Sequence, residues 1–262
     1  MQIALTIAGS DSGGGAGIQA DLKTFHQFGV YGTSAIVALT AQNTRGVRSV
    51  HAIPAEMVSA QLAALAEDLP PAALKTGMLA SAKVVGQVAA AIREYGWTRV
   101  VVDPVMAATS GDRLLEPGAD AVILEQLLPL ATLVTPNLEE AAILSGMPVD
   151  DVTSMERAGR RILESGARAV LVKGGHLPGA TLVDVLVTAQ GIQRFAHPRL
   201  PTTSTHGTGC TLSAAVTAGL ALGRDLETAV SDALDYVHRA LLAAPGLGGG
   251  HGPLQHGVPP RA

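Results

Sequence analysis

Hydrophobic positions along the chain follow two alternating patterns. Short runs rich in β-branched residues end at a glycine, a proline or an acidic residue, which predicts buried parallel strands. Between them lie longer stretches in which apolar residues recur at helical spacing. The predicted strands are 3–8, 34–39, 100–102, 132–134 and 169–172, and the predicted helices are 54–69, 81–95, 118–130, 140–145 and 154–165. Strand and helix alternate as βαβ units require, which predicts an α/β fold.

The last third of the chain departs from this alternation. Two β-rich runs, 184–188 and 193–195, flank the turn-forming residues 189–191 and predict a hairpin with antiparallel pairing at one edge of the sheet. Two helices are predicted after it, at 209–222 and 226–242, and the first is apolar nearly all round.

These elements predict a three-layer αβα arrangement around a mostly parallel central sheet. No Pro/Ser-rich linker divides the chain, so we expect a single domain over 1–245. The tail over 246–262 is rich in Gly, Pro and His, and we expect it to be irregular.

Composition supports a core built from many small side chains. Hydrophobic residues make up 47% of the chain but aromatic residues only 3%. Burial therefore depends on closely packed layers, which suits a sheet between helices.

Charge and cysteine content narrow the partners and the compartment. The formal charge is −4 and the pI is about 6.0, with no run of Lys or Arg. This pattern argues against nucleic acid or an anionic membrane and favours a small molecule. The one cysteine allows no internal disulfide, which is typical of a reducing compartment. Because the chain shows no signal peptide and no apolar stretch of about 18 residues, we expect a cytoplasmic protein.

Ligands in open α/β sheets bind at the carboxyl ends of strands, so the residues after each predicted strand are candidates. The glycine-rich segment 9–17 follows the first strand, and its glycines permit close backbone approach to a ligand. Its spacing does not match the dinucleotide fingerprint, and the chain has no Gly-Lys dipeptide of a P-loop. A flexible surface turn is the alternative interpretation.

Two further candidates follow the predicted strands 34–39 and 100–102. Gln42 has the donor and the acceptor needed to read the ring nitrogen and exocyclic amine of an aminopyrimidine, although a loop glutamine is more often only solvated. Asp103 ends a very apolar strand, where its carboxylate can hold Mg²⁺ or accept a backbone N–H in a turn.

A third junction carries Asn137 and Glu140. Their spacing predicts first of all a capping box at a helix start. A carboxylate in this place can also orient hydrated Mg²⁺ and a triphosphate. Lys173 follows the strand 169–172 and supplies a cation for phosphate groups.

The segment 206–210, His-Gly-Thr-Gly-Cys, precedes the apolar helix. Its backbone N–H groups and the helix dipole predict an anion hole suited to a transferring phosphoryl group. We expect the same field to lower the pKa of Cys210, which could then accept a proton from a substrate hydroxyl. A lone cysteine is more often inert and buried, but its place beside an anion hole favours catalysis. His206 has either a binding or a structural role.

Taken in order, these segments resemble the bacterial hydroxymethylpyrimidine and phosphomethylpyrimidine kinases of thiamine biosynthesis. The resemblance is carried by Ala-Gly-Ser-Asp-Ser-Gly-Gly-Gly-Ala-Gly-Ile-Gln-Ala-Asp (8–21), Ala-Leu-Thr-Ala-Gln-Asn-Thr (38–44), Lys-Thr-Gly-Met-Leu (75–79), His-Gly-Thr-Gly-Cys-Thr-Leu-Ser-Ala-Ala (206–215) and a Gly-His-Gly-Pro-Leu echo (250–254). It implies a ribokinase-like fold, Mg-ATP, and two successive phosphorylations, first of a hydroxymethyl group and then of the resulting phosphate.

The resemblance also implies roles for individual residues. Related sugar kinases carry an aspartate at the place of Cys210, which implies that Cys210 is the base. The implied catalytic group is Cys210 with Gly207, Thr208 and Gly209. The implied pyrimidine contacts are Gly9, Asp11, Asp21, Gln42, Met78 and Val105. The implied ATP contacts are Asn137, Glu140, Lys173 and Thr208, and the implied Mg²⁺ ligands are Asp103 and Glu140.

Some positions depart from the family pattern. Thr109 stands where many relatives carry Lys, so one phosphate contact is in doubt. Glu139 replaces a common Pro, Ser204 a common Asn, and Gly257 an aromatic residue.

Other functions remain open from the sequence alone. Pyridoxine also presents a hydroxymethyl group on a flat heterocycle, so pyridoxal kinase activity is the nearest rival. A pyrimidine-binding regulatory module without turnover is the rival from another class, and a dinucleotide oxidoreductase fits least. We expect a homodimer, because a ribokinase-like sheet edge often pairs in relatives.

Overall fold

The computed structural model describes residues 1–107, 114–175 and 177–261, and a nine-stranded sheet runs through the centre of this part of the chain. The strands are β1 (Ile3–Asp11), β2 (Tyr31–Asn43), β3 (Gly46–Ala52), β4 (Ala73–Thr76), β5 (Val100–Val102), β6 (Leu133–Val134), β7 (Ala169–Val172), β8 (Thr181–Thr188) and β9 (Gly191–Pro198). The helices are α1 (Gly17–Gln27), α2 (Ala55–Asp68), α3 (Ala82–Glu94), α4 (Ala119–Val122), α5 (Leu138–Ser145), α6 (Val152–Leu163), α7 (Thr208–Ala221) and α8 (Leu226–Leu242).

Strand order is β3-β2-β1-β4-β5-β6-β7-β8-β9. The six strands from β2 to β7 pair in parallel, whereas β3 at one edge and β8 and β9 at the other pair antiparallel. The predicted mostly parallel sheet and the predicted hairpin are confirmed. The sequence interpretation missed β3 and β4.

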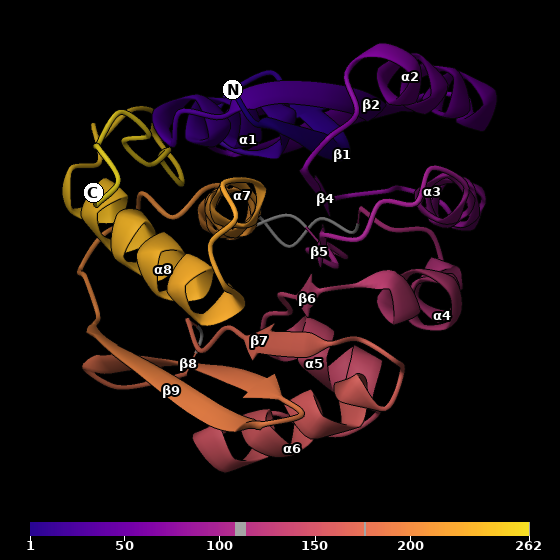
Figure 1. The fold of residues 1–262 in the computed structure, drawn as a ribbon. Coiled ribbons are helices and arrows are strands. Elements are labelled where there is room, and N and C mark those ends of the chain that lie inside the picture. Colours follow the sequence, from indigo (N-terminus) through magenta and orange to yellow (C-terminus); the bar gives the residue numbers. More distant parts are fainter. Residues whose placement is uncertain (108–113, 176, 262) are drawn as a thin grey trace.

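Helices cover both faces of the sheet, which confirms the three-layer αβα prediction (Figure 1). Alternation along β5 shows how the layers are filled: Val100 and Val102 pack against the side of α2 to α6, and Val101 packs against α1, α7 and α8. Because both faces of the strand are covered, the strand is apolar throughout.

The predicted helix over 118–130 is only partly α-helical. The α-helix α4 ends at Val122 and is followed by a π-helical turn (Ile123–Leu127) and a 3-10 turn (Leu128–Leu130). Pro129 lies within the 3-10 turn, and a proline cannot donate the N–H that would continue an α-helix.

The described part of the tail contains no helix or regular strand, but it packs against the domain. The Gly252 carbonyl accepts from the His206 N–H at 3.1 Å, and the Gln255 N–H donates to the Ala240 carbonyl at 3.1 Å. His256 is buried, and its carbonyl accepts from the Tyr236 hydroxyl at 2.7 Å. The division between a domain and a tail stays a prediction.

The described helices include none with the length and apolar character needed to cross a membrane.

Candidate active site

The parallel strands bring their carboxyl ends to one edge of the sheet, and the predicted site residues gather there. Asp11 ends β1, Asp103 follows β5 and Lys173 follows β7. Helix α7 packs against β1, β4 and β5 and begins at the same edge. The topology therefore assembles segments that are nearly 200 residues apart along the chain.

The glycine-rich segment forms a loop around the Asp11 carboxylate. Oδ1 accepts from the Gly13 N–H at 2.8 Å, and Oδ2 accepts from the N–H groups of Gly15 at 3.0 Å and Ala16 at 2.8 Å. Burial opposes ionisation of Asp11, but the hydrogen bonds from His206, Ala16 and Gly13 outweigh it and lower the pKa. Asp11 is thus ionised and holds the loop in shape through these hydrogen bonds. Its contact with the substrate stays a prediction.

This loop interlocks with the segment before α7. Gly207 has φ +81°, and a Cβ there would lie 1.8 Å from the Gly15 carbonyl oxygen. A Cβ on Gly15 would lie 2.6 Å from Cδ2 of His206. Gly207 is therefore required by the close approach of the two backbone segments, whereas Gly15 leaves space for the His206 ring.

Three predicted pyrimidine contacts form an apolar wall. Met78 belongs to a small buried cluster with Ala38 and Ala80, and Val105 packs against it. A Cβ on Gly9 would lie 2.5 Å from Cε of Met78. Gly9, Met78 and Val105 are thus brought together at the end of β1 and β2.

Asp103 is the centre of the polar half of the site. Its Oδ1 accepts from Lys173 Nζ at 3.0 Å and from the Thr135 hydroxyl at 3.1 Å, and its Oδ2 accepts from the Ser213 hydroxyl at 3.3 Å. Burial would raise the pKa of Asp103, but the charges of Lys173 and Lys75 hold it below its ordinary value. Asp103 is an anion paired with a cation at the site.

Lys173 also lies against the start of α7. A Cβ on Gly209 would lie 3.2 Å from Lys173 Nζ and 3.7 Å from Asp103 Oδ2. The ammonium group therefore lies beside the N–H groups of the first helical turn, where a phosphate would find both.

Asn137 and Glu140 form the predicted capping box of α5. The Glu140 N–H donates to Asn137 Oδ1 at 2.9 Å, and the Asn137 N–H donates to Glu140 Oε2 at 2.8 Å. Burial, with the nearby charge of Asp103, raises the pKa of Glu140 to about 7 despite the opposing effect of Lys173. The structural role is confirmed, and the ATP and metal roles stay predictions.

The acidic pair fits Mg²⁺ bound together with a nucleotide. Mg²⁺ commonly binds through one or two carboxylates and completes its shell with water and substrate phosphates. Asp103 and Glu140 supply two carboxylates. Burial and the negative charge of Asp103 both oppose ionisation of Glu140, and a bound cation would offset both effects. Over the described ranges, no group of three or more His, Cys, Asp or Glu could hold a metal by itself.

The expected low pKa of Cys210 is wrong for the ligand-free protein. Cys210 lies in the first turn of α7, where the Gly17 N–H donates to its sulfur. Its side chain keeps some exposure, but desolvation dominates and raises the pKa to about 11, although Lys75 acts in the opposite direction. The helix dipole is therefore outweighed by the surrounding protein.

Asp21 lies behind Cys210 and is fully buried. Its Oδ1 accepts from Lys75 Nζ at 2.8 Å, and its Oδ2 accepts from the Thr6 hydroxyl at 2.6 Å. Both carboxylate oxygens thus have protein partners, and the substrate contact of Asp21 stays a prediction. Gly17 and Asp21 lie one turn apart on α1, so this face of the helix contacts both Cys210 and Lys75.

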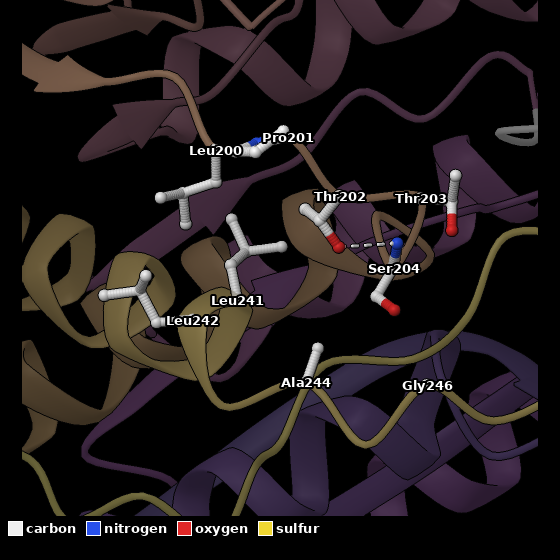
Figure 2. A pocket seen from close by; sticks show the side chains of 9 residues that line it. All are labelled: Leu200, Pro201, Thr202, Thr203, Ser204, Leu241, Leu242, Ala244 and Gly246. Atoms are coloured by element: carbon white, nitrogen blue, oxygen red, sulfur yellow. Dashed lines mark hydrogen bonds between the residues drawn. The ribbon is translucent and has the colours of Figure 1, made fainter.

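A cavity of about 710 Å³ lies between the segment before His206 and the end of α8. Figure 2 shows Leu200 and Leu241 extending toward each other, with Thr202 and Ser204 further along the same segment. The Ser204 N–H donates to Thr202 Oγ1 at 3.1 Å. The cavity therefore offers apolar surface and hydroxyl groups close to the predicted anion hole.

The sequence interpretation missed several positioning residues. Thr135 had a usable signal, since it follows β6 as Asp103 follows β5. Asp184 had none: it lies on β8 and accepts from the Gly174 N–H at 2.9 Å, next to Lys173. Burial raises the pKa of Asp184 to about 6. Thr109 lies outside the described residues.

The fold and the position of α7 define the class of protein. A sheet of this order, with a glycine-capped helix starting beside a buried acid and lysine at the carboxyl edge, is that of a ribokinase-like small-molecule kinase. Residues 11–255 match the phosphomethylpyrimidine kinase family model.

Individual relatives agree with this class. The chain is 53% identical over 257 residues to the hydroxymethylpyrimidine/phosphomethylpyrimidine kinase of Rhizobium meliloti, covering 97% of this chain and 96% of the relative. It is 42% identical to the solved phosphomethylpyrimidine kinase of Clostridium difficile, with a TM-score of 0.82 and coverage of 92% and 99%. An ADP complex of Bacillus subtilis pyridoxal kinase has a TM-score of 0.92, 40% identity and coverage of 98% and 97%.

The chain belongs to the hydroxymethylpyrimidine/phosphomethylpyrimidine kinase family. The predicted family, fold and kinase function in thiamine biosynthesis are confirmed.

Proposed function

We propose that this chain transfers the γ-phosphoryl group of ATP to the hydroxymethyl group of 4-amino-5-hydroxymethyl-2-methylpyrimidine, and then to the phosphate of the product. The observation that carries the proposal is the start of α7, where Cys210 and the N–H groups of the first turn lie beside Lys173 and Asp103. This arrangement supplies a site for a moving phosphoryl group and a polar side chain for the acceptor hydroxyl.

The pyrimidine ring is proposed to lie against Met78 and Val105. These side chains and Gly9 offer a narrow apolar surface for a flat ring. Gln42, at the end of β2, supplies the donor and acceptor that read the ring nitrogen and the exocyclic amine.

The phosphoryl group is proposed to pass over the first turn of α7. The N–H groups of residues 207–210 stabilise its charge, and Lys173 neutralises the triphosphate. Cys210 takes the hydroxyl proton in the first step. The raised pKa leaves only a small fraction of Cys210 as thiolate at neutral pH, but that thiolate is a strong base, and a loose transition state depends mainly on positioning and charge stabilisation. The proton moves from the substrate hydroxyl to the thiolate sulfur as the phosphoryl group reaches the substrate oxygen.

ATP is proposed to place its base in the cavity between Leu200 and Leu241, with its phosphates extending toward Gly209 and Lys173. The solved B. subtilis relative holds ADP, which supports an adenine nucleotide site. Asp103 and Glu140 would hold Mg²⁺, which when bound neutralises phosphate charge. Asn137 holds Glu140 in place through the capping box, and Thr208 lies at the phosphate end.

Pyridoxal kinase activity is the second candidate, because the B. subtilis pyridoxal kinase has the same fold at 40% identity. The test is ADP release with Mg-ATP and the pyrimidine, its monophosphate or pyridoxine, with products separated by ion exchange. Turnover of both pyrimidines supports the proposal. Turnover of pyridoxine alone overturns the role of Gln42, and tight pyrimidine binding without turnover supports a regulatory module.

We also propose that the protein is a cytoplasmic homodimer. β3 lies at an edge of the sheet, and Leu39 and Val50 near this edge are exposed, which supports pairing between copies. Sedimentation equilibrium measures the assembly directly, and a monomer at micromolar concentration would contradict it.

A further inference from the structure

His206 links the glycine-rich loop to Gln42 through a single ring nitrogen. Its Nε2 lies 2.9 Å from Asp11 Oδ2 and 3.1 Å from the Gln42 Nε2. One imidazole nitrogen either donates a hydrogen bond or accepts one, so these two contacts restrict each other.

The contact with Asp11 determines whether Nε2 of His206 carries a hydrogen. Asp11 also accepts three backbone N–H bonds, from Gly13, Gly15 and Ala16, so its oxygens act as acceptors. His206 Nε2 must therefore carry a hydrogen and donate it toward Asp11. A Gln42 N–H facing the same nitrogen would then oppose a second N–H, whereas the Gln42 oxygen would accept from it.

The contacts of Thr40 independently favour the same orientation of the Gln42 amide. Its hydroxyl donates to the Ser10 carbonyl at 2.9 Å, and its Oγ1 lies 3.5 Å from the other end of the Gln42 amide. Because the one hydroxyl hydrogen is used on Ser10, Oγ1 best accepts from an amide N–H. Half a turn of the terminal amide satisfies both contacts, with oxygen toward His206 and nitrogen toward Thr40.

We propose that His206, held by Asp11, is a positioning residue that locks the Gln42 amide in this one orientation and so makes the site selective for a 4-aminopyrimidine edge. This inference rests on the proposed contact between Gln42 and the ring. The amide oxygen keeps a free lone pair and the nitrogen a second N–H, which together match an exocyclic amine beside an unprotonated ring nitrogen. A 4-oxopyrimidine presents the reverse pattern, and a locked amide rejects it.

Gly15 in the glycine-rich loop makes room for the His206 ring. The 2.6 Å separation between a Cβ on Gly15 and Cδ2 of His206 leaves no room for a side chain beside the ring. Gly15 is not in the left-handed region, so an alanine there would act by displacing His206 and not through backbone strain.

The test compares binding of 4-amino-5-hydroxymethyl-2-methylpyrimidine with binding of its 4-oxo analogue by titration calorimetry. The full-length protein is used as wild type, His206→Ala, Gln42→Ala and the double variant, with His251→Ala as a matched control. His251 is a nearby loop histidine that contacts Thr205 at 3.2 Å and lies outside the network. Thermal unfolding verifies that each variant is folded.

We expect the wild type to prefer the amino compound strongly. His206→Ala should lower the ratio of the two dissociation constants by about tenfold, since the amide, then held only by the long 3.5 Å contact with Thr40, can rotate to read either edge. Gln42→Ala should lower it by a similar factor, and the double variant by no more than the larger single loss, because both substitutions remove one recognition element. His251→Ala should keep the wild-type ratio.

An unchanged ratio in His206→Ala, or losses that add in the double variant, would overturn the positioning role. If Gln42→Ala keeps the wild-type ratio, the proposed ring contact fails and this inference falls with it. If His206→Ala does not fold, Gly15→Ala provides the same test, because its methyl group should move the His206 ring and lower the ratio; an unchanged ratio in that variant overturns the inference.

Discussion

The Lys75 ammonium lies 2.8 Å from Oδ1 of Asp21, and neither side chain is exposed to solvent. The ion pair connects β4 at the centre of the sheet with α1 on its face. A buried charge that loses its partner is strongly destabilising, whereas the intact pair gives little net stability over apolar residues.

Lys75→Met should lower the free energy of unfolding by about 3–5 kcal/mol, because it leaves Asp21 buried without a cation. Urea unfolding measures the loss. The double variant Lys75→Met with Asp21→Asn should recover part of it. Lys83→Met, which removes a cation from an exposed pair with Glu56, is the control and should change little. A double variant no more stable than Lys75→Met would contradict this explanation.

Cys210→Ala should reduce the first phosphorylation by at least about a hundredfold and the second far less, since the second acceptor is already an ionised phosphate. Single-turnover rates with the pyrimidine and with its monophosphate give the two losses separately. Equal losses in both steps would identify Cys210 as a packing residue of the anion hole instead of a base.

The pH dependence of the first step should reflect the raised pKa of Cys210, about 11. A general base acts in its deprotonated form, so kcat/KM should rise about tenfold per pH unit from neutral into mildly alkaline solution. The second step and the Cys210→Ala variant should lack this slope. A plateau in the wild type below pH 8 would mean that the thiol is ionised far more easily than the ligand-free structure indicates.

Gly207→Ala should abolish activity and strongly destabilise the protein, because the methyl group meets the Gly15 carbonyl at 1.8 Å in addition to the positive φ of +81°. Gly223 is a matched control with φ +84° and nothing within 4 Å of its Cβ position. Gly223→Ala should cost only about 1–2 kcal/mol of backbone strain. Similar melting temperatures for the two variants would show that the loop contact is unimportant.

His256 should make the folded state sensitive to acid. Burial, with the nearby charge of Lys23, lowers its pKa to about 4, whereas an unfolded histidine titrates near about 6.5. Between these values only the unfolded state binds the proton, so stability is full above the upper value and falls as the pH drops toward the lower one. The loss approaches about 3 kcal/mol, and urea unfolding between pH 4 and pH 7 measures it. His256→Gln should flatten this part of the profile, and an unaltered profile would assign the acid sensitivity to other groups.

Elements whose own residues determine them were predictable from the sequence. β5 and β7 match the predicted ranges because each is a run of apolar residues buried on both faces. β4 was missed because Lys75, which reads as polar, interrupts its apolar run. Only Asp21, on another element, makes this lysine a core residue.

Predictions for the candidate site were likewise correct where they depended on neighbouring residues and wrong where they depended on distant segments. The capping box of Asn137 and Glu140 depends on a spacing of three residues and was predicted correctly. The pKa of Cys210 depends on desolvation by segments distant in sequence, and its predicted direction was wrong. Asp11 and His206 are 195 residues apart in the sequence, so no local pattern predicts their contact.

The packed tail makes the first turn of α7 depend on a segment far along the chain. The His206 N–H donates to the Gly252 carbonyl, and Thr211 Oγ1 lies 3.0 Å from Nε2 of His256, so residues 252–256 support this turn. Loosening of the segment would leave the sheet and most helices in place but would remove the support of the turn proposed for phosphoryl transfer. Activity would then be lost while the domain stays folded.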